Sequence, residues 1–152
     1  MLIFRHYHKH PEKPYLCMSM ETDKKIVLFD GVCNLCNNSV VFIIKRDKND
    51  VFRFAALQSD IGVEMTKKLN IDTSKTDSII LVEGNSYSVK STAALKIARH
   101  LKGGYPLLYG FMILPAFLRN WVYDLIAKNR YQWFGKKESC MIPTPELKAK
   151  FL

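Results

Sequence analysis

The chain of 152 residues is 48% hydrophobic and 24% charged, which is typical of a soluble globular protein with one core. Its four cysteines are too few for a disulfide-stabilised scaffold, and its longest apolar stretch, residues 107–118, is too short for a transmembrane helix. The net charge is +9, but runs of lysine or arginine never exceed two residues, so we expect a solvated basic surface and no specific nucleic-acid site.

The first 23 residues show no helical or strand period, and we expect them to form a flexible N-terminal extension. Residues 24–152 are then a single domain. The N-terminal residues lack the continuous apolar segment of a signal peptide, so a cytoplasmic location is expected.

The pattern of apolar residues predicts the elements of this domain in chain order. Strands are expected at residues 26–30, 51–55, 78–83 and 87–90, and helices at residues 37–48, 59–69 and 91–101. Gly84-Asn85 between the last two strands is a hairpin signal. Helices at residues 107–113 and 115–128 and a short terminal helix capped near Thr144 are expected to follow.

The order of these elements predicts an α/β fold. A helix joins the first two strands, so they should be parallel with a right-handed crossover, and the last two should form an antiparallel hairpin. This is the thioredoxin-like βαβαββα order with additional C-terminal helices.

Two cysteines, Cys33 and Cys36, lie between the first strand and the first helix, where thioredoxin-like proteins carry a redox-active Cys-x-x-Cys pair. Cys33 is the expected nucleophile, because the N-terminus of a helix stabilises a thiolate. Cys36 is expected to be less exposed and to resolve the mixed disulfide. No metal or cofactor is predicted, since Cys17, Cys140 and His100 lack metal-ligand spacing relative to the pair.

Asp30 and Gly31 precede the pair and leave two interpretations open. Asp30 could exchange a proton with Cys36 as a general base, or it could cap the turn from Asp30 to Cys33 by accepting backbone hydrogen bonds. We favour the cap. Gly31 is expected to provide a positive φ or a close approach of the backbone in the same turn.

Three hydroxyl or cationic side chains farther along the chain are further candidates. Ser91 and Thr92 begin a predicted helix, so they could bind an anionic group, such as a glutathione carboxylate, or simply cap the helix. Arg130 is expected to anchor the C-terminal helices on the core near the site.

The segment from Asp30 to Cys36 resembles the signature of the DCC family, which is described as thiol-disulfide oxidoreductase-like. Further matches to the family pattern are Asp77-Ser78, Lys90-Ser91-x-Ala93, Tyr123-Asp124, Asn129-Arg130-Tyr131-x-x-Phe134-Gly135 and Cys140-x-x-Pro143-Thr144. The resemblance covers about residues 25–145 and implies a thioredoxin-like fold and redox activity, without implying a substrate.

One departure from better-known thioredoxin-like enzymes concerns substrate binding. Those enzymes carry a cis-proline before the third strand, whereas this chain has no proline from Asn37 through Tyr105. We expect Asp77 or Ser78 at that position, which makes Ser78 a candidate substrate-binding residue.

We therefore predict a monomeric thiol-disulfide oxidoreductase in which Cys33 and Cys36 exchange with protein or glutathione-like thiols. The alternative is a non-catalytic thioredoxin-like module whose basic C-terminal helices bind a partner or a membrane surface. Loss of disulfide reductase activity on substitution of Cys33 would separate the two.

Overall fold

The computed structural model describes residues 24–76, 78–138 and 144–152. The predicted flexible extension, Asp77, Cys17 and Cys140 lie outside these ranges. The described chain forms a four-stranded sheet in the order β2-β1-β3-β4. The strands are β1 (Lys25–Phe29), β2 (Phe52–Ala56), β3 (Ile80–Glu83) and β4 (Ser86–Val89).

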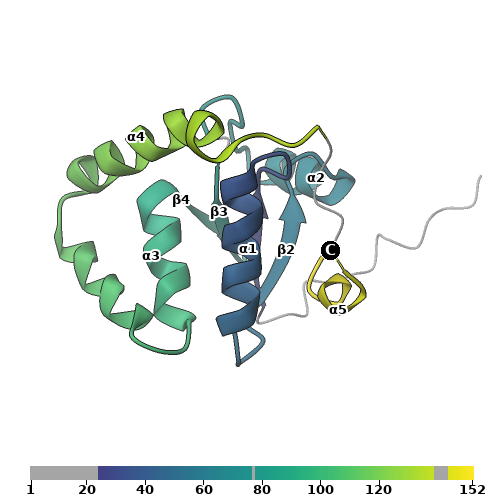
Figure 1. The fold of residues 1–152 in the computed structure, drawn as a ribbon, viewed down its shortest axis with the longest axis horizontal. Coiled ribbons are helices and arrows are strands. Elements are labelled where there is room, and N and C mark those ends of the chain that lie inside the picture. The colour runs from purple at the N-terminus through teal and green to yellow at the C-terminus, as the bar shows by residue number, and fades with distance from the viewer. Residues whose placement is uncertain (1–23, 77, 139–143) are drawn as a thin grey trace, which may run out of the picture.

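The strand pairing confirms the predicted topology. β1 and β2 are parallel, with Val27 opposite Phe54, while β3 is antiparallel to both β1 and β4. The helices are α1 (Asn34–Arg46), α2 (Asp60–Lys68), α3 (Lys90–His100), the 3-10 helix η2 (Tyr105–Ile113), α4 (Ala116–Phe134) and α5 (Pro145–Lys148). This arrangement is a thioredoxin-like α/β fold with C-terminal additions (Figure 1).

Alternation along the central strand divides the core into two clusters. Val27 and Phe29 pack with residues of α1 and α3 on one face of the sheet, whereas Leu28 packs toward α2 on the other. Successive side chains of a strand point to opposite faces, so β1 serves both layers and is completely buried from Val27 to Phe29.

The helix boundaries differ from the prediction in ways that matter for the site. α1 begins at Asn34, three residues earlier than expected, because Cys33 itself is the N-cap. α4 continues to Phe134, six residues beyond its predicted end, and Gly135 is its C-cap. The segment expected as a helix at residues 107–113 is a 3-10 helix with a proline in its first turn.

α4 lies across the end of the sheet toward which the β2 arrow points, next to the N-terminus of α1 (Figure 1). β1 and β2 are parallel, so their carboxyl ends meet at this edge, and the turn carrying the two cysteines follows β1 there. α4 thus covers the edge of the sheet where the sequence predicts the reactive residues.

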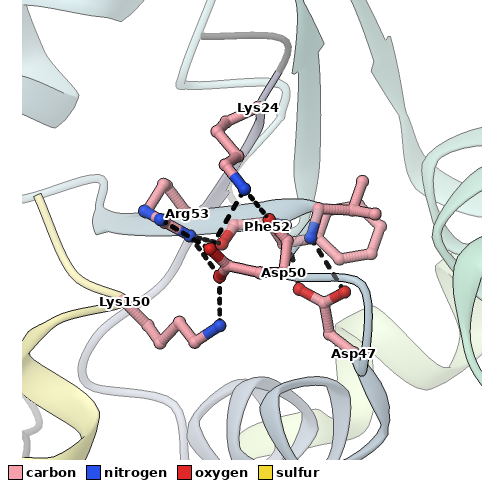
Figure 2. A network of polar contacts seen from close by, with 7 residues as sticks. Lys24, Asp47, Asp50, Phe52, Arg53 and Lys150 are labelled. Atoms are coloured by element: carbon pink, nitrogen blue, oxygen red, sulfur yellow. Dashed lines mark hydrogen bonds and ion pairs between the residues drawn. The ribbon is translucent and has the colours of Figure 1, made fainter.

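A charged cluster fixes the last residues of the chain to β2, which is an edge strand of the sheet. Asp50 accepts hydrogen bonds from Arg53 at 2.6 and 3.0 Å, from Lys24 at 3.0 Å and from Lys150 (Figure 2). Beside it, Phe54 forms a parallel bridge with Phe151, in which the Phe54 N–H donates to the Lys150 carbonyl and the Leu152 N–H donates to the Phe54 carbonyl, both at 2.9 Å. Residues 150–152 therefore extend the sheet along β2.

We predict that Asp50→Asn lowers the free energy of unfolding by about 1 kcal/mol at pH 7, because three cations lose their shared anion at a partly exposed site. These cations hold the pKa of Asp50 well below its usual range. A depressed folded-state pKa stabilises the protein above the unfolded-state pKa of about 4, so the difference from wild type should shrink as pH falls below 4. Urea unfolding from pH 3 to pH 7 measures this, with Glu64→Gln on α2 as control. A difference that does not vary with pH would contradict the assignment.

Candidate active site

Cys33 and Cys36 lie at the junction between β1 and α1. The Cys33 N–H donates to the Asp30 carbonyl at 3.3 Å, which closes the turn after β1. Cys33 is the N-cap of α1, and its sulfur accepts a hydrogen bond of 3.3 Å from the Cys36 N–H. The predicted position of the first thiol at a helix N-terminus is confirmed.

The relative exposure of the two sulfurs is not as predicted. Cys33 is 0% exposed and Cys36 is 5% exposed, so the expectation that Cys36 is the less accessible residue is wrong. Both are free cysteines. Cys33 belongs to the buried core cluster, and its backbone pairs with a segment that follows α4.

Gly135–Lys137, which we call the strap, pairs with the Cys-x-x-Cys turn. Lys136 forms an antiparallel bridge with Cys33, and the Lys137 N–H donates to the Val32 carbonyl at 2.8 Å. The side chain of Asn34 adds a hydrogen bond of 2.9 Å to the Phe134 carbonyl. The strap therefore runs alongside the backbone of the first cysteine.

The strap depends on the glycine that begins it. Gly135 has φ +80° and ψ 170°, a backbone conformation that is essentially restricted to glycine. A β-carbon at this position would also lie 3.1 Å from the Nδ2 atom of Asn34. The end of the Asn129–Gly135 block that resembles the family pattern thus has a physical role, which is to turn the chain onto the cysteines.

The buried surroundings of the Cys36 thiol disfavour its ionised form. Burial raises its pKa well above the usual range, and its hydrogen bond and proximity to the Cys33 sulfur raise it further. Arg130 acts in the opposite direction, with a smaller effect. Cys36 therefore holds its proton at neutral pH in this conformation.

Asp30 is the centre of a buried polar network. Its Oδ1 accepts hydrogen bonds from the Val32 N–H at 3.2 Å and from Gln58 at 2.9 Å. Its Oδ2 forms an ion pair of 3.2 Å with Arg130 and accepts from the Tyr131 hydroxyl. The network joins the end of β1, the end of β2 and the last turns of α4.

This network decides between the two interpretations of Asp30. The bond from the Val32 N–H confirms that Asp30 caps the turn. Gly31 donates its N–H to Gln58 and accepts from Asn37, but among the described residues the glycines with positive φ are Gly84, Gly103 and Gly135. Of the two roles expected for Gly31, the positive φ is therefore wrong, and the close approach of the backbone stays a prediction. Hydrogen bonds on both sides of the residue support the turn.

Gln58 is the site residue that the sequence analysis missed. It accepts from the Gly31 N–H at 3.1 Å and donates to Asp30, so one side chain supports both residues before the cysteines. Gln58 follows β2 by two residues, and this position could have indicated a place in the site. Parallel strands bring the residues that follow them to the same edge of the sheet.

Arg130 anchors α4 as expected, and it does so through the site. The guanidinium is buried and pairs with Asp30, while it also donates to the Tyr131 hydroxyl at 3.0 Å. Its carbon atom Cζ lies 4.6 Å from the centre of the Tyr131 ring. The pKa of Tyr131 is raised, mainly by burial.

The three candidate hydroxyl residues lie under α4. Ser78 is buried and hydrogen-bonds to Tyr123, whose hydroxyl also accepts from the Ile79 N–H at 3.4 Å. Ser91 donates to the Asn120 side chain at 2.5 Å, and Thr92 accepts from Arg119 at 3.5 Å.

The capping interpretation of Ser91 and Thr92 is wrong. Within the described ranges the N-cap of α3 is Val89, with no side-chain cap hydrogen bond. The two hydroxyls instead tie the start of α3 to α4. A role for them in substrate binding stays a prediction.

An open cleft of about 840 Å³ lies beside the network, between α2 and the strap. It is lined by Asp30, Val32, Gln58, Lys67, Asn70, Asp72, Tyr131 and Lys136, among others. Val32 and Lys136 belong to the two backbone segments that meet at Cys33. The cleft is thus lined by residues of both backbone segments, while Cys33 itself is buried and does not line it.

No group of three or more His, Cys, Asp or Glu side chains in the described ranges is placed to hold a metal ion. Within the same ranges, none of the helices combines the length and apolar character needed to cross a bilayer.

Comparison with known proteins gives consistent matches over most of the chain. Residues 27–136 match the family described as DCC1-like thiol-disulfide oxidoreductase. The uncharacterized protein YuxK of Bacillus subtilis is 47% identical over 134 residues, which cover 88% of this chain and 98% of that protein. A DCC family protein of Arabidopsis thaliana, described as chloroplastic, is 41% identical over 122 residues, 79% of this chain and 71% of its own length. No solved structure matches the chain significantly.

We predict that Arg130→Leu lowers the free energy of unfolding by about 3–5 kcal/mol, because it leaves the Asp30 carboxylate buried without its cation. Lys128→Leu, an exposed substitution two residues away on α4, is the matched control and should change stability by less than about 0.5 kcal/mol. Chemical denaturation measures both. Similar stabilities for the two variants would show that the ion pair is not what holds α4.

We predict that Gly135→Ala speeds alkylation of Cys33 by roughly tenfold or more. A side chain in this conformation costs about 1–3 kcal/mol, and opening the strap relieves that cost. Peptide mapping by mass spectrometry follows Cys33 separately from the other cysteines. Gly104→Ala is the control, since its φ is negative and a β-carbon there meets open space. Equal alkylation rates in both variants would mean that the strap does not control access.

Proposed function

The chain belongs to the DCC1-like thiol-disulfide oxidoreductase family, and on that premise we propose that Cys33 and Cys36 exchange a dithiol for a disulfide with thiol substrates. The observation that carries this proposal is the geometry of the pair. Cys33 caps α1 with its sulfur on the backbone N–H of Cys36, so one helical turn brings the two side chains together at the positive end of the helix.

The proposed reaction has two steps. The Cys33 thiolate attacks one sulfur of a substrate disulfide, the substrate S–S bond breaks, and the first substrate thiolate leaves and takes up a proton. Cys36 then loses its proton and attacks the Cys33 sulfur, which releases the second substrate thiolate. Two electrons pass to the substrate, and the protein is left with an intramolecular disulfide that a thiol reductant returns to the dithiol.

Asp30 is proposed as a positioning residue for this reaction. Each of its carboxylate oxygens already accepts two hydrogen bonds from described groups, so little lone-pair capacity is left for a proton from Cys36. Its bonds fix the turn that presents Cys33. The proton from Cys36 is then taken up by the leaving substrate thiolate.

Substrate access requires the strap to move. The cleft beside the network is lined by Val32, next to Cys33, and by Lys136, the bridge partner of Cys33, so we propose that separation of this bridge opens a path from the cleft to the sulfur. Gln58 and the cations Lys67 and Lys136 line the cleft and suit the amide and carboxylate groups of a peptide or glutathione-like thiol. We propose this cleft as the substrate site, with Ser78, Ser91 and Thr92 in supporting positions under α4.

The second candidate function is a non-catalytic interaction module. The complete burial of Cys33 favours it, because an enzyme of this class must expose its nucleophile at some stage. The two candidates differ in a measurable way, since exchange chemistry depends on the sulfurs and partner binding does not.

We predict that the protein reduces a model disulfide in the presence of a thiol reductant, and that Cys33→Ser abolishes this activity. Cys36→Ser should retain Cys33 as nucleophile but stop at the mixed disulfide. Mass spectrometry of the intact protein detects this adduct as an increase by the mass of one thiol fragment of the substrate. Cys140→Ser is the matched control for loss of a thiol outside the pair, and should keep full activity.

The same variants test the alternative. If wild type forms no intramolecular disulfide in any glutathione buffer, and Cys36→Ser traps no adduct, the exchange function is refuted and the interaction module is supported. The cytoplasmic location and the monomeric state stay predictions within this proposal.

A further inference from the structure

α4 has an inverted arrangement of polar and apolar side chains. Several polar or charged residues of α4 turn toward the body of the protein and have partners there. Asn120 bonds to Ser91, Asp124 pairs with Lys90 at 2.9 Å, and Arg130 pairs with Asp30. Among the residues of α4 that the structure describes, Arg130 is the one that is buried. α4 is therefore held by polar contacts and contributes little to the apolar core.

The outward side of α4 and the adjoining η2 is apolar. Its exposed large residues are Leu107, Leu108, Phe111, Ile113, Leu114, Phe117, Leu118, Trp121, Val122, Leu125, Ile126, Trp133 and Phe134. We call this set the η2–α4 face. Both tryptophans of the chain belong to it and are 66% and 57% exposed, while Ile113 is 90% exposed. Apolar patches of this extent mark interaction sites on soluble proteins.

The spacing within α4 shows that the apolar residues form one continuous surface. Phe117, Trp121 and Leu125 are four residues apart, and so are Leu118, Val122 and Ile126, which makes two adjacent rows along the helix. η2 extends the surface with a shallow apolar hollow of about 280 Å³. Both elements lie on the periphery of the molecule (Figure 1).

The charges around this face have one predominant sign. Between residues 99 and 137 the sequence carries seven lysines or arginines and a single acidic residue, Asp124. Asp124 is paired with Lys90. Lys102, Lys128, Lys136 and Lys137 are exposed, and they lie in α4 or in the segments directly adjoining η2 and α4. A partner must therefore combine an apolar surface with negative charge.

We propose that the η2–α4 face docks the protein on an anionic lipid bilayer, with the apolar side chains in the interface and the lysines near the headgroups. Tryptophan, phenylalanine and leucine beside lysine are typical of helices that lie in the plane of a membrane surface. A second copy of the chain fits less well, because a two-fold interface would bring the same cations of both copies together. The docked helix is α4, which lies between the bilayer and the dithiol.

Fluorescence of the full chain tests this proposal directly. Vesicles of phosphatidylcholine with 30% phosphatidylglycerol should shift the tryptophan emission to shorter wavelength, and brominated acyl chains should quench it. Vesicles of pure phosphatidylcholine should bind more weakly. Lys128→Gln should weaken binding to the anionic vesicles roughly fivefold.

A pair of matched double variants locates the surface. Phe117→Ser/Trp121→Ser should reduce cosedimentation with anionic vesicles by roughly tenfold or more, since two exposed anchors are lost. Ile61→Ser/Tyr87→Ser also removes two exposed apolar residues, but from α2 and β4, and should bind as wild type does. Circular dichroism verifies that both variants fold.

Several outcomes would overturn the proposal. One is the absence of any binding to anionic vesicles, and another is equal loss of binding in the two double variants. A third is a lipid-free dimer, seen by sedimentation velocity, that only the α4 variant dissociates, which would assign the face to a second copy of the chain.

Discussion

The buried ion pair between Asp30 and Arg130 is the interaction on which the rest of the site depends. It joins the end of the central strand to the end of α4, one hundred residues later, and the Tyr131 hydroxyl and Gln58 complete its hydrogen bonds. An ion pair removed from water is stable only when its remaining donors and acceptors are satisfied, which explains why four groups converge on one carboxylate. Since this pair places α4 across the sheet edge, it also places the strap that follows.

The strap pairs with the Cys-x-x-Cys turn, so a second backbone segment flanks the two cysteines. Cys33 has the local geometry of a reactive thiol, with its sulfur at the helix N-terminus, and yet it is buried, with its backbone paired to Lys136. Burial also keeps Cys36 protonated. The exchange proposed for the pair would therefore require a local opening, which Gly135 and the few hydrogen bonds of the strap would oppose.

The same helix explains the unusual surface of the molecule. α4 uses its polar side chains for the contacts with α3 and with the Asp30 network, so its apolar side chains are left on the outside. In an ordinary surface helix these two faces would be exchanged. The polar contacts that attach α4 beside the site and the exposure of the η2–α4 face thus have one structural cause, which is the orientation of α4.

The sequence by itself determined the features that depend on neighbouring residues. Periodicity predicted the order of the strands and helices, and spacing placed Cys33 at the start of α1 and Asp30 in its capping turn. The tertiary structure alone decided the burial of Cys33, the part played by Gln58, the positive φ at Gly135 where one was expected at Gly31, and the engagement of Ser91 with α4. The physical reason is that hydrogen-bonding partners along a helix or turn are set by local spacing, whereas partners one hundred residues apart are chosen by how α4 packs on the sheet edge.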